Sequence, residues 1–543
     1  MPFDRSALAP DSLLDTPDHE VLIIGSGFSG LGTAIRLAQT GFDDFAILEK
    51  ENEVGGTWYI NTYPGCACDV FSHVYSFSFE PNPDWSRAYS KQPEILQYLK
   101  NCADKYDIRR RVRFGAQVVQ ARFDEAAALW RVFYADASAM RRYMQARGLL
   151  AGDAIDLGDA ALPPLRQLSA RVLVSGMGPL STPAYPALPG LERFKGKTFH
   201  SQQWDHDYDL AGKRVAVIGT GASAIQFVPE IQPQVAQLDL YQRTPPWILP
   251  KPDRAMTHRE RWMFRHVPGA RALERTRLYW MLESAALAFT FKPELAARMQ
   301  RMALDYMKRK LPDPALRAKL TPDYAMGCKR VLFSRNYLPA LSQPNVAVIA
   351  DRIGEVREQS IVDAHGVERP VDAIIFGTGF RVVDPVSRGA ILGRGGRDLI
   401  DVWQGEPQAY KGTTVAGFPN LFLLVGPNVG LGHNSIVFMI ESQINYLVDA
   451  LRLMKRKRLA TIEVKPEVQA RFNDWIQRRS QRTVWVSGGC RSYYLHPETG
   501  RNFSIWPSFT FAFRRITRRF DARAYRLQTL HTPQRAQARG VSA

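Results

Sequence analysis

Two glycine-rich segments have the residue types and spacing that bind the phosphates of dinucleotides. The first follows the apolar run 21–24 and has the pattern G-x-G-x-x-G from Gly25 to Gly30. The second follows the run 214–218 and has the pattern G-x-G-x-x-A from Gly219 to Ala224. Such residues form a tight turn, let the backbone approach a pyrophosphate and allow close helix–strand packing, and the helix N-terminus favours the anion. We therefore predict two strand–turn–helix units that bind dinucleotides.

The residue at the end of the next strand differs between the two units. Glu49 follows the predicted strand 45–48, and Arg243 follows the predicted strand 238–242. Each lies 24 residues after the first glycine of its own unit. A carboxylate accepts hydrogen bonds from a free ribose 2′-hydroxyl, whereas an arginine suits a 2′-phosphate. The first unit is therefore predicted to bind FAD and the second to bind NADPH.

These units predict an α/β fold with two Rossmann-like dinucleotide-binding domains. We expect residues 1–182 to form the first part of the FAD domain and residues 183–380 to form the NADPH domain. Residues 381–543 are expected to complete the FAD domain and to add a C-terminal loop and a basic tail. The NADPH domain is predicted to contain a helical insertion at about 257–320. This insertion either packs on the domain or forms a wall of the substrate pocket.

Several shorter segments give further expectations. Residues 1–19 are expected to be a poorly ordered lead-in, residues 117–132 a β-hairpin, and residues 181–190 a proline-rich linker. Residues 136–168 are expected to be a surface excursion with a helical piece at 140–147. A helix is predicted to start at 432–435, capped by Asn434 or Ser435, with its N-terminus directed at the flavin.

Composition excludes several classes of protein. The formal net charge is +18, and the chain from residue 511 onward has eight Arg against one Asp. The tail pattern indicates a solvated helix face beside Ile516 and Phe520 rather than a nucleic-acid site, and the remaining charge can steer NADPH. No secretory signal and no membrane span is expected. Five cysteines do not suggest a disulfide framework or, at Cys66-x-Cys68, a zinc site, so we expect no metal and a cytoplasmic protein.

Three further motifs carry a resemblance to a known family. Residues 55–69, G-G-T-W-Y-I-N-T-Y-P-G-C-A-C-D, resemble a fingerprint of type I Baeyer–Villiger monooxygenases. Residues 194–205, F-K-G-K-T-F-H-S-Q-Q-W-D, resemble the second fingerprint, between the two Rossmann units. Residues 377–379, G-T-G, resemble the family's A-T-G motif with Gly in place of Ala. The resemblance covers roughly residues 21–520, and the segment 484–507 resembles the mobile C-terminal loop that covers the site, although core packing explains it nearly as well.

The resemblance implies oxygen insertion beside a ketone carbonyl, which gives an ester or lactone through a C4a-peroxyflavin. It places the active-site arginine at Arg330, and Asp69 would orient Arg330 and the nicotinamide. An arginine is a suitable fixed cation for a peroxide anion because it stays protonated and its planar fork can serve two oxygens. His200 is expected to shape domain closure rather than to transfer protons.

The candidate catalytic residues are thus Arg330 and Asp69. The candidate FAD contacts are Gly25, Gly27, Phe28, Ser29, Gly30, Glu49, Gly56, Thr57, Trp58, Asp69, Tyr75, Val118 and Asn434. The candidate NADPH contacts are Gly219, Thr220, Gly221, Ala222, Ser223, Ala224, Arg243, Thr244, Lys329 and Arg330, with His200 at the NADPH site or the domain interface.

Two alternatives remain open at this point. One is an S- or N-oxygenating flavin monooxygenase on the same scaffold. The other is a flavin disulfide reductase, which needs a C-x-x-C or C-x-x-x-x-C pair, whereas this chain has only C-x-C. The expected partners are a small ketone or sulfide and O2, with a monomer favoured. The sequence does not identify the substrate.

Overall fold

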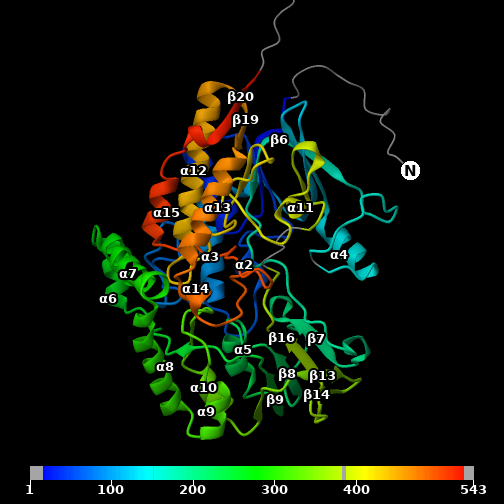
Figure 1. Cartoon of the computed structure of the whole chain (residues 1–543), viewed down its shortest axis with the longest axis vertical. Coiled ribbons are helices and arrows are strands. Elements are labelled where there is room, and N and C mark those ends of the chain that lie inside the picture. The colour runs from blue at the N-terminus through cyan, green and yellow to red at the C-terminus, as the bar shows by residue number, and fades with distance from the viewer. Residues whose placement is uncertain (1–15, 151, 382–386, 531–543) are drawn as a thin grey trace, which may run out of the picture.

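A computed structural model describes residues 16–150, 152–381 and 387–530 (Figure 1). The expected lead-in at 1–19 lies outside the described residues except for its last four positions, and so does the end of the basic tail. None of the described helices is both long and apolar enough to cross a bilayer.

The first sheet is built around the FAD-type unit. Its strand order is β17-β4-β5-β6-β1-β2-β3, and β18 also pairs with β6. Their bounds are β1 His19–Ile24, β2 Phe45–Leu48, β3 Val112–Arg113, β4 Ala116–Asp124, β5 Leu129–Asp136, β6 Arg166–Ser175, β17 Ile391–Leu392 and β18 Leu421–Leu423. The pairs β1–β2 and β1–β6 are parallel, and β4–β5–β6 is an antiparallel meander that confirms the predicted hairpin.

Helices cover this sheet and form the upper part of the molecule in Figure 1. They are α1 Phe28–Gln39, α2 Thr57–Ile60, α3 Gln92–Lys105, α11 Leu399–Trp403, α12 Ile436–Lys457, α13 Pro466–Ser480, α14 Val484–Ser487 and α15 Thr510–Thr517. The long helix α12 packs against α1 and α15. The C-terminal strand β20 Tyr525–Thr529 pairs with β19 Leu459–Val464, so the end of the described chain is tied to the same layer.

The second sheet contains the NADPH-type unit and lies in the lower part of Figure 1. It has five parallel strands in the order β12-β9-β8-β16-β7. Their bounds are β7 Lys197–His200, β8 Arg214–Ile218, β9 Gln237–Tyr241, β12 Val346–Ile349 and β16 Ala373–Phe376. Helices α5 Ala224–Ile231 and α10 Tyr337–Leu341 pack beside it, with the small sheets β10 Ile248–Leu249 with β11 Leu332–Phe333, and β13 Ile353–Val356, β14 Ser360–Asp363 and β15 Glu368–Pro370. The buried, apolar strands are typical of a parallel sheet covered on both faces.

The expected helical insertion is confirmed. It comprises α6 His258–His266, α7 Ala270–Ala286, a π-turn at Leu287–Phe291, α8 Ala296–Lys310 and α9 Pro314–Leu320. Thr257 and Glu260 form a capping box at the start of α6, which satisfies two backbone N–H groups of its first turn. Short 3-10 turns lie at Arg109–Arg111, Leu191–Arg193, Ser201–Gln203, Pro293–Leu295, Arg394–Gly396 and Ala522–Ala524.

The excursion at 136–168 is partly regular. Helix α4, Ala137–Ala146, begins three residues before the predicted helical piece because Asp136 accepts a hydrogen bond from the Ala139 amide and caps the helix. Met140 and Tyr143 are buried against β4 and β5, and strand β6 already begins at Arg166. The excursion therefore packs on the FAD sheet, and only its middle is irregular.

Two chain crossings join the two sheets side by side. The first crossing runs through Pro183 and the second through Phe380, and these residues form an antiparallel bridge. The backbone amide of Arg381 donates to the Thr182 carbonyl at 2.9 Å, and the Ala184 amide donates to the Gly379 carbonyl at 2.9 Å. The paired crossings restrict how the two sheets can move relative to each other.

Candidate active site

The first glycine turn has the geometry that a pyrophosphate site needs. Gly25 has a φ of +90°, and a Cβ placed at Gly30 would overlap the Gly25 carbonyl oxygen, so a glycine is required at each position. Phe28, Ser29 and Gly30 form the first turn of α1, and Gly27 at the N-cap supplies no side-chain cap. The amides at this helix end can therefore serve an anion, and the segment fits FAD.

Glu49 lies where the sequence placed it, at the end of β2. Its side chain is buried and accepts hydrogen bonds from the Ser26 amide and hydroxyl at 2.7 Å each. The Glu51 amide donates to its other oxygen at 2.9 Å. The carboxylate is therefore held rigidly beside the glycine turn by protein donors that the sequence pattern did not predict.

The first fingerprint loop packs directly on that turn. A Cβ at Gly56 would lie 2.9 Å from the Gly27 Cα, which explains the second glycine of the loop. Thr57 begins α2, and the buried Trp58 donates from its indole N–H to the Tyr75 hydroxyl at 3.3 Å. Val118, from β4, is partly buried and packs against the core beneath this sheet. Apart from Asn434, the candidate FAD residues thus lie on β4, in the turn and first helical turn that follow β1, or in the segment between β2 and α3.

The second glycine turn repeats this geometry. Gly219 has a φ of +107°, and a Cβ there would overlap the Gly377 carbonyl oxygen of the third motif. Gly221, Ala222 and Ser223 lead into α5, which starts at Ala224 without a side-chain cap from Ser223. The Thr220 hydroxyl donates to the Thr244 carbonyl at 3.3 Å. This segment fits the pyrophosphate of NADPH for the same reasons as the first turn fits FAD.

Two cations beside the second turn form no salt bridge among the described residues, although the Asp323 carboxylate acts on Lys329. Arg243 is exposed, and neither Arg243 nor Lys329 forms a salt bridge with any residue that the structure describes. Burial and the neighbouring charge of Arg243 lower the pKa of the Lys329 ammonium. Two mutually repelling cations are stabilised when an anion lies between them, so the pair fits a 2′-phosphate.

Arg330 and Asp69 form an ion pair between distant parts of the chain. The guanidinium Nε donates to an Asp69 carboxylate oxygen at 2.6 Å, and Nη1 lies 3.5 Å from the Leu431 carbonyl oxygen. Both side chains are partly exposed, at 29% and 26%. Burial acts to raise the pKa of Asp69, but the charge and hydrogen bond of Arg330, together with the charge of Lys251, outweigh burial and lower that pKa. Asp69 in turn raises the pKa of Arg330. Both groups are therefore charged at neutral pH.

Side chains that the sequence analysis missed surround this pair. Lys251 donates to the Cys68 carbonyl at 2.9 Å, and its charge acts on Asp69. Tyr494 is buried, and its hydroxyl accepts a hydrogen bond from Tyr493 at 3.3 Å, near enough for the Arg330 charge to affect it. Both missed residues come from segments with no spacing relation to residue 330, so no sequence pattern could pair them.

Gln226 joins the two dinucleotide units. It lies on α5, accepts a hydrogen bond from the Tyr63 hydroxyl at 3.0 Å and donates to the Ala67 carbonyl at 2.9 Å. The fingerprint loop that carries Asp69 is thereby fixed to the NADPH unit. This contact brings the first turn of α5 next to the loop that packs on the FAD turn.

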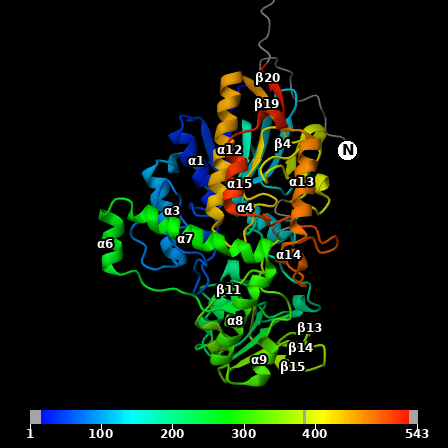
Figure 2. The same cartoon turned by 60° about the vertical axis from the view of Figure 1, so that its left-hand side comes forward.

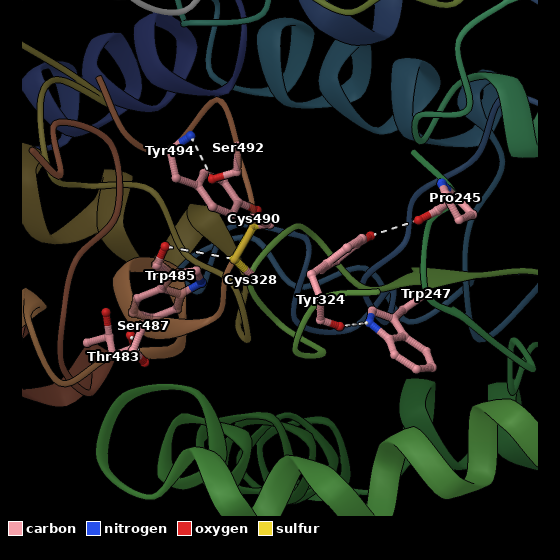
Figure 3. Close-up of a disulfide and its surroundings, with 10 residues drawn as sticks. All are labelled: Pro245, Trp247, Tyr324, Cys328, Thr483, Trp485, Ser487, Cys490, Ser492 and Tyr494. Carbon is pink, nitrogen blue, oxygen red and sulfur yellow. Dashed lines mark hydrogen bonds between the residues drawn. A yellow bond between two sulfur atoms is a disulfide. The ribbon is translucent and has the colours of Figure 1, made fainter. Parts of the chain in front are cut away.

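A disulfide links the segment before Arg330 to the C-terminal loop. Cys328 and Cys490 are bonded across 162 residues, and Figure 3 shows the bond with Tyr494 close by on the same loop. Cys66, Cys68 and Cys102 are free and buried. The five cysteines suggested no disulfide framework, and this bond corrects that expectation for one pair. The sequence did not reveal this pair because only the tertiary fold brings the two cysteines together.

His200 lies at the end of β7 beside the two chain crossings. It is fully buried, its ring contacts those of Tyr185 and Phe380, and its Nδ1 accepts from the Gln202 amide at 3.2 Å. Burial lowers its pKa to about 4. A neutral imidazole at the crossings fits the expected role in domain closure, which stays a prediction.

Asn434 makes hydrogen bonds that the sequence did not predict. Its amide donates to Glu283 of α7 at 2.7 Å, and its oxygen accepts from the Ser435 amide. Ser435 is the N-cap of α12, as one of the two expected alternatives proposed. Burial acts to raise the pKa of Glu283, but the neighbouring His433, Thr510 and Asn434 outweigh it and lower the pKa. This ionised carboxylate ties the helical insertion to the start of α12.

Comparisons with known proteins agree with this geometry. Residues 23–91 match the model of the NAD(P)-binding Rossmann-like domain, and residues 169–269 match that of flavin-binding monooxygenase-like proteins. A Baeyer-Villiger monooxygenase of Pseudomonas aeruginosa is 56% identical over 96% of this chain and 95% of its own. Another, from Streptomyces coelicolor, is 46% identical over 93% of this chain and 92% of its own.

Solved structures are similar over almost the whole chain. Cyclohexanone monooxygenase from Rhodococcus sp. Phi1 bound to NADP+ has a TM-score of 0.78 at 26% identity, covering 95% of this chain and 100% of that chain. OTEMO in complex with FAD and NADP has a TM-score of 0.78 at 26% identity, covering 94% and 100%. With the two glycine turns, the fingerprints and these relatives, the chain belongs to the Baeyer–Villiger monooxygenases, FAD- and NADPH-dependent enzymes that insert one oxygen atom of O2.

Proposed function

We propose that Arg330 and Asp69 form the reaction centre at which this enzyme converts a small ketone to an ester or lactone. The observation that carries the proposal is the 2.6 Å ion pair between the fingerprint loop and the segment that follows the helical insertion. FAD supplies the oxidation chemistry when bound, and NADPH supplies the hydride. The protein's own contribution is to position these groups and to stabilise the charge that develops.

Arg330 has the donors that such a centre needs. Its Nε is used by Asp69, whereas Nη2 has no acceptor among the residues that the structure describes. That edge of the fork can donate to a ketone oxygen or to the transferred oxygen as negative charge builds up there. Asp69 holds the fork in orientation, and Tyr494 on the C-terminal loop helps to exclude water.

Product analysis tests the proposal directly. The purified enzyme with NADPH and O2 would be given matched ketones and sulfides, and products would be separated and identified by mass and fragmentation. Esters or lactones from ketones are the expected result. A protein that oxidises sulfides but no ketone would instead be an S-oxygenating enzyme on the same scaffold.

We expect Arg243→Ala to weaken NADPH binding about ten- to a hundredfold while leaving NADH binding nearly unchanged. A charge-assisted hydrogen bond contributes about 1.5–3 kcal/mol, and only NADPH carries the 2′-phosphate that would receive it. The measurement is KM and Kd for both coenzymes, with the exposed Arg352→Ala of the same domain as a control. Equal losses for NADPH and NADH would assign Arg243 a different role.

A further inference from the structure

Exposed apolar side chains are concentrated on the helical insertion. Among the described residues, 19 large apolar side chains are exposed, and 11 of them lie between residues 262 and 304. This segment is only 43 residues long, so the concentration does not follow from chance distribution over the surface. Exposed apolar surface gathered on one part of a protein is a candidate interaction site.

Helix α7 and its π-turn carry the clearest stripe. Leu273, Trp280, Leu287 and Phe291 are 74%, 56%, 45% and 39% exposed, and their spacing of seven, seven and four residues places them on one helix face. Phe511 of α15, 43% exposed, lies beside Trp280 with 6.1 Å between ring centroids. We call these five residues the α7 face. In Figure 2 helix α7 crosses the front of the molecule, with nothing drawn in front of it.

The other side of α7 already has its packing partners. Leu278, Glu283 and Ala286 are buried, and Glu283 is bonded to Asn434 at the start of α12. The helix is therefore apolar on two sides, and only one is used by the fold. A surface helix needs one apolar stripe to pack, and the second stripe stays largely exposed although Trp280 contacts Phe511 and Phe291 stacks on Phe509.

The helical insertion that carries the α7 face is strongly positive. Within residues 257–310, nine exposed side chains are basic and two are acidic. The basic ones are Arg259, Arg265, Arg277, Lys292, Arg298, Arg301, Lys308, Arg309 and Lys310, of which Arg265 and Arg277 are paired with Asp84 and Glu274, and the acidic ones are Glu294 and Asp305. On α15, Arg514 and Arg515 add two exposed charges close to Phe511. A second copy of this chain would bring like charges together, which opposes self-association through this face.

We propose that the α7 face binds the surface of an anionic phospholipid bilayer. Exposed Trp, Phe and Leu side chains enter the boundary between headgroups and acyl chains, and surrounding Arg and Lys side chains bind anionic headgroups. The 17-residue helix α7 would lie in the plane of the membrane surface rather than cross it. This is peripheral binding, which combines an apolar stripe with basic side chains, as this insertion does.

The position of the face relates it to the reaction centre. The π-turn that ends α7 carries Phe289, and a Cβ at Gly327 would lie 2.6 Å from its ring. Gly327 lies three residues before Arg330. A bilayer on the α7 face would thus adjoin the wall of the site, which, given the proposed function, favours ketones that dissolve in lipid.

The test measures vesicle binding by the full-length holoenzyme. Sedimentation with vesicles of phosphatidylcholine alone or with one quarter phosphatidylglycerol would be followed at low and high salt. We expect binding to the anionic vesicles, weaker binding at high salt, and little binding to phosphatidylcholine alone. The double variant Leu273→Glu with Trp280→Glu is expected to bind at least tenfold more weakly.

A matched control separates the face from net charge. Val367→Glu with Val402→Glu changes two exposed apolar residues elsewhere by the same charge, and it should bind vesicles like the parent. Bound FAD and NADPH oxidation in all variants would show that they are folded, independently of ketone turnover. The proposal fails if no vesicle binds, if both variants lose binding equally, or if Leu273→Glu with Trp280→Glu only abolishes a dimer.

Discussion

Replacement of Arg330 by alanine is expected to leave FAD bound but to lower ester formation a hundredfold to a thousandfold. Among the residues that the structure describes, Arg330 hydrogen-bonds to Asp69 and the Leu431 carbonyl and to neither glycine turn. Loss of one preorganised electrostatic group at a reaction centre costs about 2.7–4 kcal/mol in the transition state. The flavin spectrum would report FAD, and product formation in single turnovers would report the chemical step.

Two further variants distinguish charge from geometry. Arg330→Lys restores the cation but not the fork, so it should recover only part of the activity. Arg335→Ala removes an exposed arginine five residues away and should behave like the parent. Ketone oxygenation at the parent rate in Arg330→Ala would exclude Arg330 from the chemistry and leave the proposed ion pair with a structural role only.

The protonation state of Asp69 sets the pH range of these measurements. Its pKa is below the ordinary value in the folded protein, so ionised Asp69 contributes stability above its unfolded pKa. That contribution is lost as the pH falls through the lowered folded pKa, well below neutrality. The Arg330 comparisons at pH 7–8 therefore test a fully formed pair.

The dinucleotide-binding turns could be predicted from the sequence because their requirements are local. The steric demand at Gly30 comes from a carbonyl five residues earlier, and Glu49 lies at the end of the adjacent strand. Gly219 and Arg243 also lie within one βαβ unit, although the carbonyl that excludes a Cβ at Gly219 belongs to the distant Gly377. The helical insertion could likewise be predicted, from its composition and its length.

The remainder of the site depends on tertiary packing. The pairing of Asp69 with Arg330 came only from a family resemblance, and nothing in the spacing identified Lys251 or Tyr494 as neighbours. Asn434 was expected to face FAD, yet its amide is used by Glu283 from the helical insertion. A sequence pattern identifies which residues can bind an anion or a ring. It does not identify which distant segment of the chain contacts those residues in the folded protein.

The pairing of the cysteines also depends on tertiary packing and could not be predicted from the sequence. Counting five cysteines in a long chain favours free thiols, and three of the five are indeed free and buried. Cys328 and Cys490 became a pair only because the loop that follows α14 folds back over the segment before Arg330. The backbone also meets there, since the Ala325 amide donates to the Gly488 carbonyl at 3.0 Å.

Replacement of Cys490 by serine is expected to lower the free energy of unfolding by about 2–5 kcal/mol, because the bond closes a very long loop in the unfolded chain. For a chain of this size that corresponds to a melting temperature lower by about 2–5 °C. The loop 488–501 should also become more sensitive to proteolysis, because one of its attachments beside Arg330 is gone. Differential scanning fluorimetry and limited proteolysis would measure both effects.

The pair of cysteines provides its own controls. Cys328→Ser should match Cys490→Ser, and the double variant should be no less stable than either single variant, because one bond is lost in every case. Dithiothreitol should convert the parent to the behaviour of Cys490→Ser and leave that variant unchanged, while thiol titration under denaturing conditions rises from three to five groups. Additive losses in the double variant would instead show that the two thiols contribute separately through packing. Since Tyr494 follows Cys490 by only four residues, a released loop should also lower kcat/KM for ketones while NADPH binding at Arg243 is preserved.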